Sequence, residues 1–254
     1  MAAAASPVPG LRSVRAVVFD TDGVITDSAP MHAAAWKKAF DACLATHPGQ
    51  RPFDETDDYR LHVDGLPRQD GAEAFLASRG IDLPPGSPDD PPGTDTVHAV
   101  TARKEEEFTR ILHARPVSVW PGTVRLLHAL RDERMPRAAA SSSRHATELL
   151  DGAGLLDLFD AVVDGNESHR LGLPGKPDPA LFTEAARRLG TPPRDTAVVE
   201  DALAGVEAGR RGGFGLVVGV DRTQGSGSAD DLRRHGADVV VSDPGDLLSG
   251  GEDD

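Results

Sequence analysis

Apolar residues recur along the chain in short unbroken runs, each followed by turn-forming residues and then by a helical pattern. Six runs rich in valine and alanine fall at residues 14–20, 136–143, 160–165, 195–201, 214–220 and 237–243. Because these runs do not alternate apolar with polar positions, they are typical of strands covered on both faces. The helical segments between them supply the cover. The pattern therefore predicts an α/β fold with a doubly wound parallel sheet.

The interval between the first two runs exceeds 110 residues, which is far longer than one crossover connection. Helical patterns lie within it at residues 28–47, 68–80 and 95–114. The first begins at Ser28, a good helix cap, and the second ends at a glycine. Residues 83–93 are too rich in proline and glycine for regular structure. The interval therefore predicts a helical cap domain inserted after the first strand.

Domain boundaries follow from these patterns. We expect the helical cap to span residues 29–115, and a Rossmann-like core to be formed by residues 11–28 together with 116–247. Residues 1–10 and 248–254 are predicted to be disordered tails. A chain of 254 residues is long enough to bury a core of this kind.

Composition limits the partners of the protein. Acidic residues number 41 against 27 basic ones, and the net charge of −14 repels nucleic acid and anionic membrane surfaces. An anionic ligand therefore has to be held by a local group of positive charges. Cys43 is the only cysteine, so neither an intrachain disulfide nor a cysteine-based metal site can form. With no secretion signal and no run of about 18 apolar residues, we expect a cytoplasmic monomer.

Polar side chains follow several predicted strands at the point where each strand ends. Asp20, Ser141 and the pair Glu200 and Asp201 occupy such positions, and ligands of an open parallel sheet collect beyond the carboxyl ends of its strands. Carboxylates gathered there repel one another unless a cation compensates, and hard oxygen ligands suit Mg²⁺. With the charge neutralised, one carboxylate can attack phosphorus to form an aspartyl phosphate while a second moves the proton.

Each of these positions also has a simpler explanation. An Asp-x-Asp sequence in so acidic a chain can form a turn, and Glu200 with Asp201 can cap the next helix. The serines at 141–143 can cap a helix too, and Lys176 can be a surface lysine held in a turn. The positions of these four groups taken together favour a functional site, because all of them fall at or just beyond strand ends of one predicted sheet.

The same order resembles the haloacid dehalogenase superfamily of phosphoryl-transfer enzymes from about residue 14 to residue 243. FDTDGVITDS, AAASSS, GKPDPALF and VVEDALAGVEAG are similar to its four motifs, in sequence. The resemblance implies that Asp20 is the nucleophile and a Mg²⁺ ligand. It implies that Asp22 is the general acid and base and offers its backbone carbonyl to the metal. The other implied residues are phosphate-binding Ser141, Ser142 and Lys176, and metal-binding Glu200 and Asp201.

The inserted segment narrows the resemblance to the β-phosphoglucomutase-like group, through DGVITDSAPMHAAAWKKAF and VDGLPRQDG. Contacts with the substrate or its distal phosphate are implied for His32, Trp36, Arg68, Lys104 and Arg144. Packing in the cap is the alternative interpretation for the histidine and the tryptophan. The chain departs from the group at Asp64, where a lysine is frequent, and at His145, where an asparagine is common.

The resemblance implies Mg²⁺-dependent phosphoryl transfer on a small sugar phosphate through an aspartyl phosphate. A sugar hydroxyl as acceptor makes the enzyme a β-phosphoglucomutase-type mutase, and water as acceptor makes it a phosphatase. A site for a second phosphate favours the mutase, whereas Asp64 opposes it. Two other classes are a phospho-accepting receiver domain, disfavoured by the long insertion, and a silent phospho-ligand-binding protein, disfavoured by the complete motifs.

Overall fold

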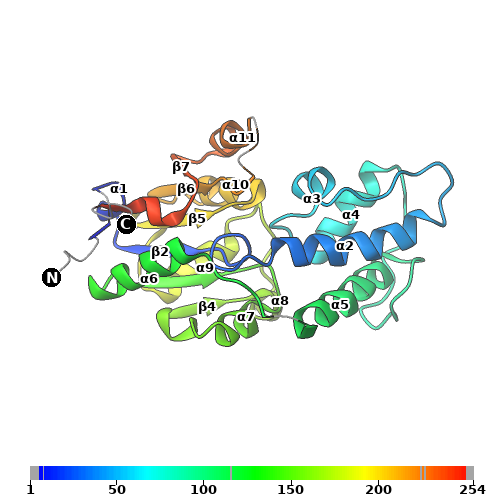
Figure 1. The fold of residues 1–254 in the computed structure, drawn as a ribbon, viewed down its shortest axis with the longest axis horizontal. Coiled ribbons are helices and arrows are strands. Elements are labelled where there is room, and N and C mark those ends of the chain that lie inside the picture. Colours follow the sequence, from blue (N-terminus) through cyan, green and yellow to red (C-terminus); the bar gives the residue numbers. More distant parts are fainter. Residues whose placement is uncertain (1–5, 8, 115, 224, 226, 250–254) are drawn as a thin grey trace. The chain divides into compact units, whose positions relative to one another are not determined.

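The structure is a computed structural model that describes residues 6–7, 9–114, 116–223, 225 and 227–249 (Figure 1). The chain divides into two compact units. One is formed by the residues up to Asp27 and those from Ser118 onward, and the other by Ser28–Val117. The first unit contains the predicted strands, and the second contains the helical interval between the first two of them.

A six-stranded sheet in the order β4-β3-β2-β5-β6-β7 forms the middle of the first unit. All neighbouring strands in it are parallel. The strands are β2 (Ala16–Phe19), β3 (Arg137–Ala140), β4 (Ala161–Val163), β5 (Thr196–Glu200), β6 (Leu216–Val220) and β7 (Val239–Val241). Each of the six apolar runs contains one of them, so the predicted doubly wound fold is confirmed.

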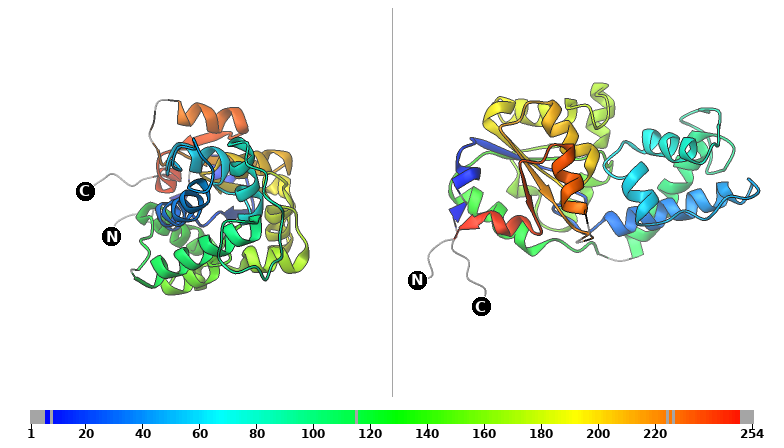
Figure 2. Two further views of the ribbon diagram at one scale, coloured as in Figure 1. Left: turned by 90° about the vertical axis from the view of Figure 1, so that its right-hand side faces the viewer. Right: turned by 90° about the horizontal axis from the view of Figure 1, so that it is seen from above.

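Helices cover both faces of this sheet, as the right-hand view of Figure 2 shows. Val17 and Phe19 of β2 pack in one apolar cluster with leucines of α6, whereas Val18 packs in the other with side chains of α9 and α10. All three side chains are fully buried, which explains the unbroken apolar runs. The helices of this unit are α1 (Pro9–Arg12), α6 (Pro121–Asp132), α7 (Ala146–Gly152), α8 (Gly165–Leu171), α9 (Ala180–Arg188), α10 (Leu203–Arg211) and α11 (Ser228–His235). Short 3₁₀ turns lie at Leu156–Leu158, Pro193–Asp195 and Pro244–Leu247.

The two ends of the described chain differ from the predicted disordered tails. β1 (Ser6–Pro7) pairs antiparallel with β8 (Leu248–Ser249), and α1 begins at Pro9. Pairing of the two strands satisfies hydrogen bonds of their backbone groups, and the partly buried Leu248 packs against the apolar core. The amino-acid composition of these segments does not indicate either contact. The predicted tails 1–10 and 248–254 are thus wrong at these positions, and their other residues, 1–5, 8 and 250–254, lie outside the description.

Four helices build the second unit around an aromatic core. They are α2 (Ala29–Leu44), α3 (Asp57–His62), α4 (Arg68–Ser78) and α5 (Val97–Ala114). Phe40 lies at the centre of this core, with ring centroids 4.1 Å from Phe75, 4.7 Å from Trp36 and 5.1 Å from Phe53. The loop 83–93 has no regular structure, as its proline and glycine content predicts.

The short helix α3 was not expected from the sequence, and one buried carboxylate explains its position. Asp58 is only 3% exposed and pairs with Arg51 at 2.8 Å and Arg79 at 2.5 Å. Its second oxygen also accepts the backbone N–H of Asp54 at 2.9 Å. Burial alone would raise the pKa of Asp58, yet these bonds hold that pKa below its usual value. The ion pairs therefore fix α3 to segments before and after it.

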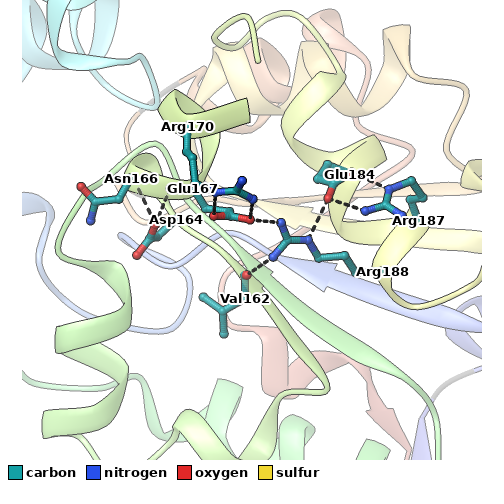
Figure 3. Close-up of polar contacts among 8 residues, drawn as sticks. All are labelled: Val162, Asp164, Asn166, Glu167, Arg170, Glu184, Arg187 and Arg188. Carbon is teal, nitrogen blue, oxygen red and sulfur yellow. Dashed lines mark hydrogen bonds and ion pairs between the residues drawn. The ribbon is translucent and has the colours of Figure 1, made fainter. Parts of the chain in front are cut away.

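An ion pair joins α8 to α9, and a hydrogen bond from Arg188 attaches α9 to the edge strand β4 (Figure 3). Arg188 donates to Glu184 on its own helix at 2.8 Å, to Glu167 of α8, and to the carbonyl of Val162 at 3.1 Å. Asp164 caps α8 by accepting the N–H groups of Asn166 and Glu167. An edge strand is otherwise open to pairing with another chain. The arginine instead covers one of its carbonyls.

Replacing Arg188 by alanine is expected to lower the free energy of unfolding by about 1 kcal/mol, since partly exposed ion pairs are screened by solvent. The effect should depend on pH. Hydrogen bonds from Arg170 and then Arg188 lower the pKa of Glu167 to about 2 from a usual 4.5, and those from Arg187 and then Arg188 lower that of Glu184 equally. Depressed carboxyl pKa values stabilise the fold above pH 4.5, and this contribution is lost as pH falls toward 2. Urea unfolding of both proteins between pH 2 and pH 7 should show the difference shrinking in acid; a constant difference would contradict this explanation.

No helix within the described part of the chain combines the length and the apolar character needed to cross a membrane.

Candidate active site

Three neighbouring strands bring acidic and hydroxyl side chains to one edge of the sheet. Asp20 directly follows β2, Ser141 directly follows β3, and Glu200 ends β5 with Asp201 behind it. The strands are parallel and in register, with Phe19 opposite both Ala139 and Val199. Their carboxyl ends therefore coincide, and the side chains beyond them meet in space.

Lys176 is the positive centre of this edge. Its Nζ donates to Oδ1 of Asp20 at 2.6 Å and to Oε2 of Glu200 at 2.9 Å, and its side chain is fully buried. Burial by itself lowers the pKa of a lysine, but the two carboxylates more than offset this and raise the pKa of Lys176. The Lys176 amine therefore stays protonated and holds both carboxylates in place.

Asp20 is 5% exposed and carries a strongly perturbed carboxyl group. Burial raises its pKa well above the usual value, the charge of Glu200 adds to this, and Lys176 opposes it. Two buried carboxylates thus share one ammonium, which leaves an excess of negative charge. A divalent cation beside them would supply the missing positive charge.

Donor chemistry fits such a cation. Carboxylate oxygens of Asp20, Glu200 and Asp201 lie within 4.8 Å of one another, and hard oxygen ligands are those of Mg²⁺. Gly23 lies against this group with a positive φ of 80°, and a Cβ there would approach Oδ2 of Asp201 to 1.8 Å. A Cβ at Gly205 would likewise approach the Glu200 carboxyl carbon to 2.1 Å. Glycine at both places leaves the carboxylates room.

The second carboxylate of the first motif, Asp22, is held from the neighbouring strand. The Ser141 hydroxyl donates to Oδ2 of Asp22 at 3.1 Å and accepts the backbone N–H of Ser143 at 3.0 Å. Ser142 is half-buried beside it, and Arg144 is exposed. This serine loop therefore fixes the orientation of Asp22 and keeps backbone N–H groups close to it.

In the helical unit, two of the predicted substrate residues pair with each other and a third pairs with a glutamate. Lys104 is 4% exposed and its Nζ donates to Nδ1 of His32 at 3.0 Å. Both groups lie on Phe108, the imidazole stacked at 4.0 Å between centroids and the ammonium 4.5 Å from the ring centre. Arg68, at the start of α4, forms a 2.5 Å ion pair with Glu105 of α5. Trp36 is 3% exposed and packs within the aromatic core.

Some of these positions could be found from sequence and others could not. The first unit brings together Asp20, Asp22, Ser141, Lys176, Glu200 and Asp201. Sequence reasoning missed Glu105, whose only signal is its place next to Lys104 in an acidic stretch. It also missed Arg222, which donates to the backbone carbonyl of Gly23, the residue after Asp22. No motif or pattern in the sequence marks this arginine.

Comparison with known proteins settles the family. A family model described as haloacid dehalogenase-like hydrolase matches residues 14–213. The chain belongs to the haloacid dehalogenase-like hydrolase family. The expected family, fold and enzyme class are thereby confirmed.

Several known proteins resemble the chain over nearly its whole length. A β-phosphoglucomutase of Mycobacterium bovis is 44% identical over 249 residues, which cover 96% of this chain and 95% of the relative. A β-phosphoglucomutase of Bacillus subtilis is 33% identical over 90% of this chain and 92% of its own. The crystal structure of a β-phosphoglucomutase from Clostridium difficile shares the fold, with a TM-score of 0.73 and 23% identity over 92% of this chain and 93% of that one.

Proposed function

We propose that this haloacid dehalogenase-like protein is a β-phosphoglucomutase-type enzyme, which transfers a phosphoryl group within a small sugar phosphate through an aspartyl phosphate on Asp20. The observation that carries the proposal is the Asp20–Lys176–Glu200 arrangement, a buried carboxylate held by a protonated lysine at a sheet edge. The resemblance to mutases over nearly the full chain supports the sugar phosphate as substrate.

Lys176 and the serine loop bind the phosphoryl group in this proposal. The ammonium opposes the charge of the phosphate oxygens, and the Ser141 and Ser142 hydroxyls with nearby N–H groups donate to them. Asp20 attacks phosphorus in line, which forms the acyl phosphate and breaks the bond to the leaving oxygen. Asp22 gives its proton to that oxygen and later takes one from the acceptor hydroxyl.

Asp20, Glu200 and Asp201, with the backbone carbonyl of Asp22, are the proposed ligands of Mg²⁺. When bound, the cation neutralises charge on the phosphoryl oxygens and on the carboxylates around them. The 4.8 Å grouping of the three carboxylates supports this ligand set.

Positive side chains outside the sheet edge are proposed to bind the rest of the substrate. A mutase that passes through a sugar bisphosphate needs a site for a second phosphate, and Arg68, Lys104 and Arg144 are the candidates. His32 then orients the ammonium of Lys104 through their 3.0 Å hydrogen bond. A planar guanidinium suits a phosphate because it donates two parallel hydrogen bonds.

Hydrolysis of small sugar phosphates is the second candidate function, and one pair of residues favours it. Glu105 already neutralises Arg68 at 2.5 Å, and Asp64 adds negative charge in the segment before that arginine. A phosphate has to displace or share the Glu105 carboxylate in order to bind Arg68. Weak binding of a sugar bisphosphate would leave water as the acceptor.

The two functions are separated by following both products of one reaction. The protein is incubated with β-glucose 1-phosphate, Mg²⁺ and a trace of glucose 1,6-bisphosphate, while glucose 6-phosphate and free phosphate are measured together. A mutase produces glucose 6-phosphate in large excess over free phosphate. Free phosphate alone would replace the mutase by the phosphatase, and the absence of both products would reject this sugar as substrate.

Arg68→Ala is expected to raise KM for the bisphosphorylated sugar about 10- to 100-fold, because a charged hydrogen-bonding contact is lost. Hydrolysis of acetyl phosphate, which has no second phosphate, should be unchanged. Arg110→Ala is a matched control, since Arg110 also pairs with a glutamate of α5 but is 63% exposed. Equal losses on both substrates would show that Arg68 supports the fold and does not bind the distal phosphate.

A further inference from the structure

The turn that follows the two catalytic aspartates is held at every carbonyl from Gly23 to Thr26. The Thr26 carbonyl accepts the N–H of Gly23 at 2.7 Å, which closes the turn on itself. The other three carbonyls accept donors from distant segments: Arg222 to Gly23, Thr123 to Val24 and the N–H of Trp120 to Ile25. The conformation of this turn therefore depends on residues far away in the sequence.

Arg222 is the donor that connects these supports. Its Nε donates to the carbonyl of Gly23 at 2.7 Å and its Nη2 to that of Val24 at 3.4 Å. Its Nη1 donates to the Ser242 carbonyl at 3.1 Å and lies 3.5 Å from the Asp243 carboxylate. The guanidinium carbon lies 3.7 Å from the ring centre of Trp120, so the two planar groups are in close cation–π contact.

Small displacements of this turn reach the chemistry directly. Gly23 is bonded to Asp22, and its α-carbon lies so close to Asp201 that a Cβ there would meet Oδ2 at 1.8 Å. A shift of the turn would therefore move Asp22 away from its 3.1 Å contact with Ser141, and would change the space around Asp201. A misplacement of about 1 Å is enough to lower a rate strongly.

We infer that Arg222, stacked on Trp120, is a positioning residue for phosphoryl transfer: it fixes the turn 23–26 and through it the proton-transferring Asp22. The inference rests on the proposed role of Asp22 but not on the identity of the sugar. Arg222 touches no group that reacts. It acts through the Gly23 and Val24 carbonyls, which only a forked donor can hold while it also reaches Ser242.

The charge of Arg222 is maintained where it lies. Its side chain is 14% exposed, and burial lowers the pKa of Arg222 below its usual value, although the charges of Asp201, Asp243 and Asp27 oppose this. A guanidinium has so high a pKa that it remains protonated under these conditions. Arg222 can therefore donate as a cation to the carbonyls of Gly23, Val24 and Ser242 and to the Asp243 carboxylate.

The test uses the full chain with Mg²⁺ and acetyl phosphate, so that failure of the mutase proposal does not affect it. Arg222→Ala is expected to lower kcat about 10- to 100-fold with KM changed less than threefold, since the phosphate-binding groups remain. Guanidinium ion at millimolar concentration should restore part of kcat by filling the space on Trp120. Arg222→Lys should remain impaired, because an ammonium lacks the planar fork.

Matched measurements separate positioning from a general loss of structure. Arg233→Ala, which removes a 56%-exposed arginine of α11, should leave kcat unchanged. The folded fraction of each variant is measured by circular dichroism at the assay temperature. An unchanged kcat in Arg222→Ala would overturn the inference. So would a loss of kcat that merely follows the folded fraction, with no recovery in guanidinium and full activity in Arg222→Lys.

Discussion

Asp20→Asn is expected to reduce Mg²⁺-dependent phosphoryl transfer by about 10⁴- to 10⁶-fold, the loss typical of a removed nucleophile. The amide is nearly the same size as the carboxylate but does not attack phosphorus and binds a cation poorly. The ammonium of Lys176 keeps its 2.9 Å bond to Glu200, so the fold should be retained. Steady-state turnover and intact-protein mass after addition of acetyl phosphate measure the effect, the second by the absence of a phosphorylated enzyme.

Asp27→Asn is the matched control for this substitution. Asp27 follows the turn 23–26, is half-buried and has no proposed role in the reaction. Its variant should form the phosphorylated enzyme and turn over within about threefold of the wild type, as expected for a residue outside the reacting groups. Substantial turnover by Asp20→Asn would refute the aspartyl phosphate and redirect attention to direct attack by water.

Lys176→Met is expected to impair both stability and activity. It leaves the buried carboxylates Asp20 and Glu200 without the ammonium that lies 2.6 and 2.9 Å from them. Removing one partner of a buried ion pair destabilises a protein by about 3–5 kcal/mol. Turnover should fall by about three orders of magnitude, since a charged donor to the phosphoryl group is lost as well.

The stability loss in Lys176→Met should depend on pH in a defined direction. Burial and Glu200 raise the pKa of Asp20, Lys176 opposes them, and its removal raises that pKa further. A carboxyl group with a raised pKa in the folded state destabilises the fold more as pH rises, because the charged form is disfavoured there. Urea unfolding in EDTA should therefore show a smaller gap from the wild type at pH 5 than at pH 8. The control Lys38→Met replaces an exposed lysine and should be as stable as the wild type at both pH values. A loss of stability in Lys176→Met that is the same at pH 5 and pH 8 would contradict the electrostatic explanation.

The sheet and its acidic edge were predictable because their causes are local in sequence. Fully buried residues such as Val17 and Val198 make unbroken apolar runs, and the residue after each run lies at the carboxyl end of a strand. Parallel order then brings Asp20 and Glu200 together without further information. The fold and the grouping of acidic side chains follow from this simple rule.

Features that depend on distant contacts could not be predicted. Arg222 donates to a carbonyl 199 positions earlier, and every residue offers such a carbonyl, so no pattern marks the pair. The helix α3 is too short for periodicity and is fixed by Asp58 through arginines on either side. The pairing of β1 with β8 is likewise a property of the folded chain.

The junctions of the helical unit have a consequence for how the chain folds. The N–H of Asp27 donates to the carbonyl of Ser118 at 2.8 Å, and these two residues flank a segment of about 90 residues. Closing so long a flexible loop costs about 4 kcal/mol of chain entropy. In the folded helical unit, Met31 near one end packs in the same apolar cluster as Val117 at the other, which shortens the effective loop. Early formation of the α2–α5 pair would therefore accelerate assembly of the sheet, and substitutions that loosen this pair would slow refolding of residues far outside it.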